Sequence, residues 1–149
     1  MLASTTTVGG SAKITSASTY YDRKEGYALF SGGVAVDNGE YQMHANRAFV
    51  FMDANNELKR IVALGDVVVT NGTKRASGGK ASYYREPGMI VLTAAEGGVA
   101  EVRDEKEGGA QVVRGKKIKF WTETEQVEVL EAVLTAPVDG ERLGIEIGR

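Results

Sequence analysis

The residues that could carry out chemistry in this chain are few and poorly spaced for it. The single histidine, His44, alternates with Met43 in a strand-like stretch and is predicted to face solvent. A serine–histidine–aspartate mechanism would need this histidine, and the sequence contains no Gly-x-Ser-x-Gly motif. Glu123 and Glu125 could act as the paired carboxylates of a glycosidase, but their spacing in the sequence does not give their separation in space. The residue types therefore favour a protein that is not an enzyme.

Metal and phosphate sites are also disfavoured. Asp53, Asn55 and Glu57 alternate like the first ligands of a calcium loop, but the glycine and the distant glutamate of such a loop are missing. We interpret these three residues as turn formers. Cysteine is absent, which excludes disulfides and zinc–thiolate sites. Gly32-Gly33 and the later glycine pairs precede no helical pattern, so a phosphate cradle is not predicted, and we expect no cofactor.

Composition indicates one globular domain. The chain has 149 residues, of which 42% are hydrophobic and 26% charged, and its formal net charge of −2 does not favour nucleic-acid binding. No stretch approaches the ~18 apolar residues of a membrane helix, and no signal peptide is visible at the N-terminus. Because the first residues are small and polar, we predict a flexible N-terminal arm over residues 1–12 and a single domain over residues 13–149.

Alternating apolar residues between turn signals predict many short antiparallel strands. Asp37-Asn38-Gly39 and Asn71-Gly72 are hairpin signals, because Asn and Gly adopt the positive φ that tight turns require. Residues 26–51 are predicted to form three short strands with a break at Gly32-Gly33, and residues 104–109 a charged loop. The other predicted strands cover residues 14–21, 58–70, 75–84, 89–93, 99–102, 112–121, 126–134 and 143–147.

An internal repeat supports this arrangement. The segment 75–84 recurs as 112–121 at a shift of 37 residues, since Gly78 aligns with Gly115 and Tyr83 with Phe120. Each unit is a strand that ends in an aromatic pair, followed by a polar turn and an apolar return strand. One hairpin cannot bury its own apolar face, so repeated hairpins predict an all-β fold, a stack or roll of antiparallel strands.

The ordered set of motifs resembles the LptA/OstA-like lipopolysaccharide-transport family over roughly residues 14–134. The motifs are Ile14-x-Ser16, Phe30-x-Gly32-x-Val34-x-Val36, Met43-x-Ala45-x-x-Ala48-x-Val50, Leu58-x-x-Ile61-x-Ala63-x-Gly65-x-Val67, Gly78-x-x-Ala81-x-Tyr83, Leu92 and Gly115-x-x-Ile118-x-Phe120. The chain departs from the family pattern at Asn46, where the family often has Asp, and over residues 93–98, which are longer than the usual turn.

The resemblance implies an antiparallel β-jellyroll, a folded-over roll of short strands with an apolar groove. It also implies a periplasmic protein that takes part in outer-membrane biogenesis by binding lipopolysaccharide and shielding its acyl chains. The partners implied are inner- and outer-membrane transport proteins of the same fold and further copies of the chain, joined head to tail. On this reading, strands near residues 14–21 and 127–134 pair with neighbouring domains through their main chains.

Strand parity predicts which apolar side chains would line the groove. Phe49 and Phe51 are included although Ala48 and Val50 compete with them for the inward face, and a closed core would show the same alternation as a groove. The predicted lining comprises Val36, Met43, Phe49, Phe51, Ile61, Val69, Tyr83, Ile90, Leu92, Ile118, Phe120 and Val129.

Four cations are candidates for contact with the phosphates of the lipid at the groove mouth, namely Arg75, Lys80, Arg114 and Lys117. The alternative, a solvated outer face, is the more ordinary position for Lys and Arg.

Two other functions stay open at this point. A structural β-solenoid could polymerise without any lipid ligand, and a carbohydrate-active enzyme could be built on a β-roll. Within the family resemblance, the chain is expected to be a bridge subunit, with the N-terminal domain of the outer-membrane partner as the alternative.

Overall fold

The computed structural model describes residues 4–8, 12–106 and 109–132, which form eleven β-strands. In this part of the chain no helix is long and apolar enough to cross a membrane. The strands are β1 (Ser4–Val8), β2 (Ala12–Ser16), β3 (Ser18–Asp22), β4 (Tyr27–Asp37), β5 (Gln42–Met52), β6 (Leu58–Asn71), β7 (Lys74–Tyr84), β8 (Met89–Thr93), β9 (Ala100–Lys106), β10 (Gly109–Trp121) and β11 (Val127–Ala132).

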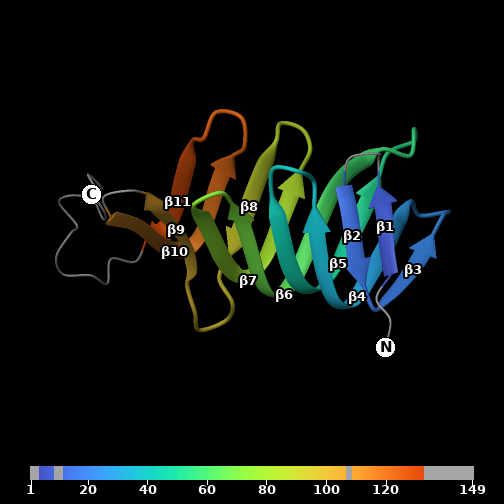
Figure 1. Ribbon diagram of the computed structural model, residues 1–149, viewed down its shortest axis with the longest axis horizontal. Coiled ribbons are helices and arrows are strands. Elements are labelled where there is room, and N and C mark those ends of the chain that lie inside the picture. The colour runs from blue at the N-terminus through green and yellow to red at the C-terminus, as the bar shows by residue number, and fades with distance from the viewer. Residues whose placement is uncertain (1–3, 9–11, 107–108, 133–149) are drawn as a thin grey trace.

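All strands pair antiparallel in one sheet, with the order β1-β2-β4-β5-β6-β7-β8-β10-β11. β3 also pairs with β4, and β9 pairs with both β7 and β10. The strands therefore follow one another along the long axis of the molecule, from β1 and β3 at one end to β11 at the other (Figure 1). The predicted all-β fold, a folded-over antiparallel roll, is confirmed.

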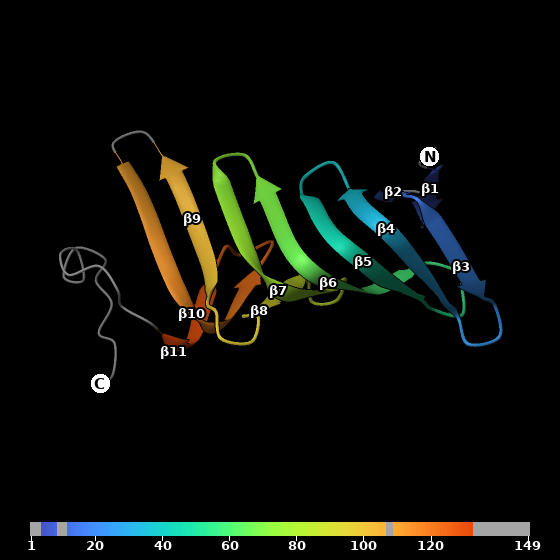
Figure 2. The ribbon, with the colours of Figure 1, turned by 90° about the horizontal axis from the view of Figure 1, so that it is seen from below.

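The long strands bend, and the bends fold the sheet into two layers. The register of the strand pairs shifts between Ser31 and Val34 in β4, between His44 and Arg47 in β5, and between Leu64 and Val67 in β6. Gly65, with a φ of +84°, takes the left-handed backbone that this bend requires in β6. Figure 2 shows the hairpins β4–β5 and β6–β7 rising away from the layer that contains β8 and β11.

We call the two layers layer I and layer II. Layer I contains β3, β8, β11 and the parts of the long strands that pair with them or extend that half of the sheet, namely residues 27–31, 47–52, 58–64, 80–84 and 117–121. Layer II contains β1, β2, β9 and residues 34–37, 42–44, 67–71, 74–78 and 109–115.

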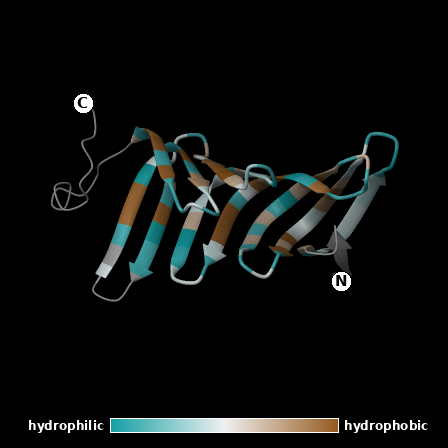
Figure 3. Ribbon diagram, turned by 90° about the horizontal axis from the view of Figure 1, so that it is seen from above, coloured by the Kyte–Doolittle hydropathy of each residue, from teal (hydrophilic) through white to brown (hydrophobic). Residues whose placement is uncertain are grey.

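A single hydrophobic core lies between the layers. Phe30, Val50 and Ile118 come from layer I, Ile14 and Val67 from layer II, and each is almost completely buried. Figure 3 shows hydrophobic and hydrophilic residues alternating along the long strands, as expected when one face of each strand meets the core. Burying the apolar face in this way provides most of the driving force for the fold.

Both predicted hairpins form. The first joins β4 to β5, and the Asn38 side-chain oxygen accepts hydrogen bonds from the backbone N–H groups of Glu40 and Tyr41 at 3.0 and 2.8 Å. Gly39 has a φ of +96°, which its lack of a side chain allows. The second joins Asn71 to Lys74 through Gly72 and Thr73, and Gly72 has a φ of +60°.

Four predictions of local structure need correction. Ser4–Val8 form β1 and pair with β2, whereas the sequence predicted a flexible arm over residues 1–12. The single strand predicted over residues 14–21 is divided at Ala17 into β2 and β3, because the partner strand β4 bends at Gly32, opposite Ala17. β4 also runs through Gly32-Gly33 as one strand with a bulge, where a break between two strands was predicted.

The fourth correction concerns the charged segment 104–109. β9 continues to Lys106 and β10 begins at Gly109, so strand replaces most of the predicted loop. The strand predicted over residues 143–147 lies outside the described residues.

Candidate functional site

The space between the two layers is the candidate site, and most of the predicted lining faces it. Tyr83, Phe120 and Val129 are only partly buried and pack against the core from its margin. Seven other predicted residues are buried within the core, namely Val36, Met43, Ile61, Val69, Ile90, Leu92 and Ile118. The interior is therefore lined by apolar side chains of graded exposure, packed at its centre and accessible at its margin.

Phe49 and Phe51 do not belong to this lining. Ala48 and Val50, their neighbours in β5, are fully buried and occupy the inward positions. Phe49 and Phe51 therefore lie on the outer face, where their ring centroids are 6.3 Å apart and each lies about as close to the ring of Tyr27. Because Ala48 and Val50 are buried, strand alternation places the two rings outside.

The four predicted phosphate contacts also lie on outer faces. Arg75 and Lys80 are exposed and adjoin the buried Ala76 and Ala81, so strand alternation directs them away from the interior. Lys117 precedes the buried Ile118 in the same way.

Arg114 faces outward as well, and its Nε donates a hydrogen bond to Oε1 of Glu101 at 2.9 Å. The structure therefore favours the solvated outer face over the groove mouth for these cations.

The margin of the interior contains apolar residues that the sequence analysis missed. Tyr41 and Met52, at opposite free ends of the layers, are partly exposed and pack against the core, and so does Val102 in β9. At the far end of the molecule, Val127 pairs with Phe120 and is 52% exposed. Tyr41, Val102 and Val127 alternate with polar neighbours in the sequence, whereas Met52 follows Phe51, and the face that each side chain takes depends on the strand register.

One ion pair joins the free ends of the two layers. Lys74 begins β7 in layer II, and Glu125 lies in the turn between β10 and β11 in layer I. The Lys74 Nζ lies 2.8 Å from Oε1 of Glu125. The hydrogen bond to Glu125 raises the pKa of Lys74 above the usual lysine value, which partial burial opposes. This contact crosses the open side of the roll.

Tyr83 lies beneath the same open side. Burial raises the pKa of its phenol, and the charge of Arg85 opposes the shift. The carboxylates of Glu40, from the β4–β5 loop, and Glu123, from the β10–β11 turn, add to the rise. Because these groups come from both layers, the phenol is placed where the two free ends approach each other.

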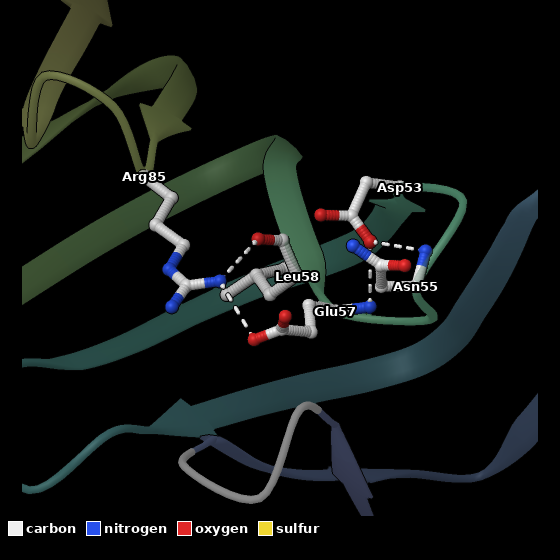
Figure 4. A network of polar contacts seen from close by, with 5 residues as sticks. All are labelled: Asp53, Asn55, Glu57, Leu58 and Arg85. Carbon is white, nitrogen blue, oxygen red and sulfur yellow. Dashed lines mark hydrogen bonds and ion pairs between the residues drawn. The ribbon is translucent and has the colours of Figure 1, made fainter.

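The residues considered for catalysis or metal binding have structural or solvent-exposed positions. His44 is exposed on the outer face of β5. The Oδ1 atom of Asp53 accepts hydrogen bonds from the N–H groups of Asn55 and Glu57 at 2.8 and 3.0 Å, which confirms the interpretation of this segment as a turn (Figure 4). Within the described ranges no cluster of three or more His, Asp or Glu residues could hold a metal ion.

Comparison with known proteins identifies a family and a similar fold. A family profile described as the LptA/(LptD N-terminal domain) LPS transport protein matches residues 13–126. The crystal structure of LptH from Pseudomonas aeruginosa, described as the LptA-homologous periplasmic component of the lipopolysaccharide transport device, is similar with a TM-score of 0.70 and 21% sequence identity. The alignment covers 85% of this chain and 88% of that one. No curated protein sequence gives a significant match.

Proposed function

Since the chain belongs to the LptA and LptD N-terminal domain family of lipopolysaccharide transport proteins, we propose that it carries lipopolysaccharide through the periplasm without catalysis. The acyl chains of the lipid lie between layer I and layer II, and the polar part of the lipid stays outside. The apolar residues at the margin of the interior, Tyr83, Phe120 and Val129, are the observation that supports this proposal.

The energetics suit a carrier. Each methylene that leaves water for an apolar environment contributes about 0.8 kcal/mol, so several acyl chains bind strongly without any precise polar site. The buried centre of the interior must then admit the chains by a separation of the layers. The exposed Lys74–Glu125 pair at the free ends contributes at most about 1 kcal/mol against such a separation, so the buried core provides most of the resistance to it.

The strand edges support assembly with like domains. At one end β3 pairs with β4 alone among the described strands, and at the other end β11 pairs with β10 alone. An edge strand offers its outward main-chain groups to a further strand. We propose that β1 and β3 of one domain receive β10 and β11 of another, which continues the apolar interior from domain to domain, either in a homo-oligomer or with transport partners of the same fold.

Native mass spectrometry with and without lipopolysaccharide tests the carrier function. The variant Phe120→Asp places a charge at the margin of the interior, and Trp121→Asp places the same charge on the outer face of the same strand. We expect a lipid adduct with the unaltered protein that Phe120→Asp reduces at least tenfold and Trp121→Asp leaves nearly unchanged. Circular dichroism confirms that both variants are folded.

Two outcomes would overturn the proposal. Equal amounts of lipid adduct with all three proteins would exclude the interior as the binding site. No adduct at all, together with polymers whose length depends on protein concentration, would favour a β-solenoid scaffold without a lipid ligand.

A further inference from the structure

A cavity lies on the rim of layer I, outside the space between the layers. It is a cleft of about 550 Å³. Its walls come from the end of β5, the start of β6 and the end of β7, with the turns that follow β5 and β7 at its rim. The lining residues are Phe51, Asp53, Leu58, Lys59, Arg60, Tyr84, Arg85 and Glu86.

Two aromatic residues flank an arginine in the strand register of this cleft. Arg60 pairs with Phe51 on one side and with Tyr84 on the other, so all three side chains project from the same outer face. Neighbouring strands are about 4.8 Å apart, which places the backbones that carry the two rings about 10 Å apart. The guanidinium carbon of Arg60 lies 4.5 Å from the centroid of the Phe51 ring, an arrangement that holds the charge in place.

The cleft has positive charge available for a ligand. Arg85 is already engaged, because its Nη1 lies 3.4 Å from Oε2 of Glu57 and 3.5 Å from the backbone oxygen of Leu58 (Figure 4). Lys59 and Arg60 form no ion pair with any residue that the structure describes. Two cations thus face a cleft whose carboxylates, Asp53 and Glu86, sit at its rim.

The floor of the cleft connects it to the interior. Leu58 lines the cleft and is also a buried member of the hydrophobic core. Met52, which adjoins the cleft in β5, packs against the same core. A ligand whose apolar part lies between the layers can therefore place its polar part over this rim without crossing the molecule.

We propose that this rim cleft binds a negatively charged sugar, through stacking on Tyr84 and through charge-assisted hydrogen bonds from Lys59 and from Arg60, which the Phe51 ring holds in place. The faces of aromatic rings match the C–H faces of sugar rings, and guanidinium groups match phosphate and carboxylate substituents. The rim carboxylates can accept hydrogen bonds from sugar hydroxyl groups. The inference rests on the proposed function, since the phosphorylated saccharide part of lipopolysaccharide supplies such a ligand beside the acyl chains.

Fully deacylated, phosphorylated lipopolysaccharide is the probe that separates the cleft from the interior. Its binding to the full chain is measured by calorimetric titration with the unaltered protein and with Arg60→Gln. The matched control is Lys80→Gln, which removes one charge from the outer face of the same layer but outside the cleft. We expect Arg60→Gln to weaken binding about tenfold or more and Lys80→Gln to change it by less than about twofold.

Further variants and probes distinguish a failure of the cleft proposal from a failure of the carrier function. Phe120→Asp is expected to retain binding of the deacylated probe while it loses binding of whole lipopolysaccharide, which distinguishes the cleft from the carrier function. Tyr84→Leu is expected to weaken binding of the probe with the fold retained, as judged by thermal unfolding. The proposal is overturned if the deacylated probe does not bind, if Lys80→Gln weakens it as much as Arg60→Gln, or if a dephosphorylated probe binds equally well.

Discussion

At the scale of single residues, the alternation of side chains along a strand decides which of two neighbouring residues faces the interior. In β5 the small Ala48 and the branched Val50 face the core, and the large Phe49 and Phe51 face outward. Hydrophobicity alone would have chosen the opposite pair. The two outward rings pack on Tyr27, and the Phe51 ring also orients the guanidinium group of Arg60. Phe51, which does not line the interior as predicted, thus lines the rim cleft instead.

The first prediction compares two leucines in positions of different burial. Leu92 is fully buried in the core, whereas Leu130 is 38% exposed in β11. Leu92→Ala removes buried methyl groups and leaves a cavity, so we expect the free energy of unfolding to fall by about 2–5 kcal/mol. Leu130→Ala serves as the control, with an expected loss below about 1 kcal/mol. Urea denaturation measures both, and similar losses would contradict the burial described for Leu92.

At the scale of elements, the bends of the long strands matter more than the straight parts. Each bend needs a backbone that turns without a clash against the next strand. A Cβ atom added at Gly65 would collide with the side chain of Asn46 in β5, whereas one added at Gly33 in β4 would meet no atom within 4 Å. Both glycines have a positive φ, of +84° and +81°.

This difference gives the second prediction. In Gly33→Ala only the left-handed backbone is unfavourable, and we expect the free energy of unfolding to fall by about 1–2 kcal/mol. In Gly65→Ala the same backbone cost applies and Asn46 must also move, so the loss should be clearly larger. Thermal unfolding followed by circular dichroism compares the two variants. Equal losses of unfolding free energy would show that Asn46 in the neighbouring strand moves aside at no energetic cost.

The sequence predicts the elements well and the bends poorly. Hairpins at Asn38 and Asn71 could be predicted, because a turn depends on a few adjacent residues. The division of one predicted strand at Ala17 depends on Gly32 in the next strand, and this contact is not visible before the register is known. The rim cleft was missed for the same reason, since its two rings and its guanidinium group come from three different strands.

At the scale of the whole molecule, two layers joined at a line of bends pack together through the hydrophobic core, and an ion pair joins their free ends. The Lys74–Glu125 ion pair crosses between those ends, and Tyr83 packs against the margin of the core. For both Lys74 and Tyr83 the pKa in the folded protein is raised above its ordinary value. A raised pKa means that the folded state holds the proton more tightly than the unfolded state, so stability is lost as the pH rises through the alkaline range.

The third prediction uses this pH dependence. Lys74→Met should lower the free energy of unfolding at pH 7 by at most about 1 kcal/mol, because the pair is largely exposed and screened by solvent. The difference between Lys74→Met and the unaltered protein should shrink as the pH rises beyond the usual lysine pKa of about 10.4, where the unaltered side chain also loses its charge. Denaturant titrations between pH 7 and 11 measure this, and Lys59→Met provides the control. A difference that stays constant with pH would exclude a charge effect.

The line of bends has a mechanical consequence. The long strands turn at Gly32-Gly33, near Asn46 and at Gly65, and these positions follow one another from strand to strand. The bends therefore form a continuous line that joins the two layers along one side. In the proposed carrier, a separation of the layers on the side opposite this line would let a lipid enter from the side, so that its sugar part stays outside and the size of that part does not limit its passage.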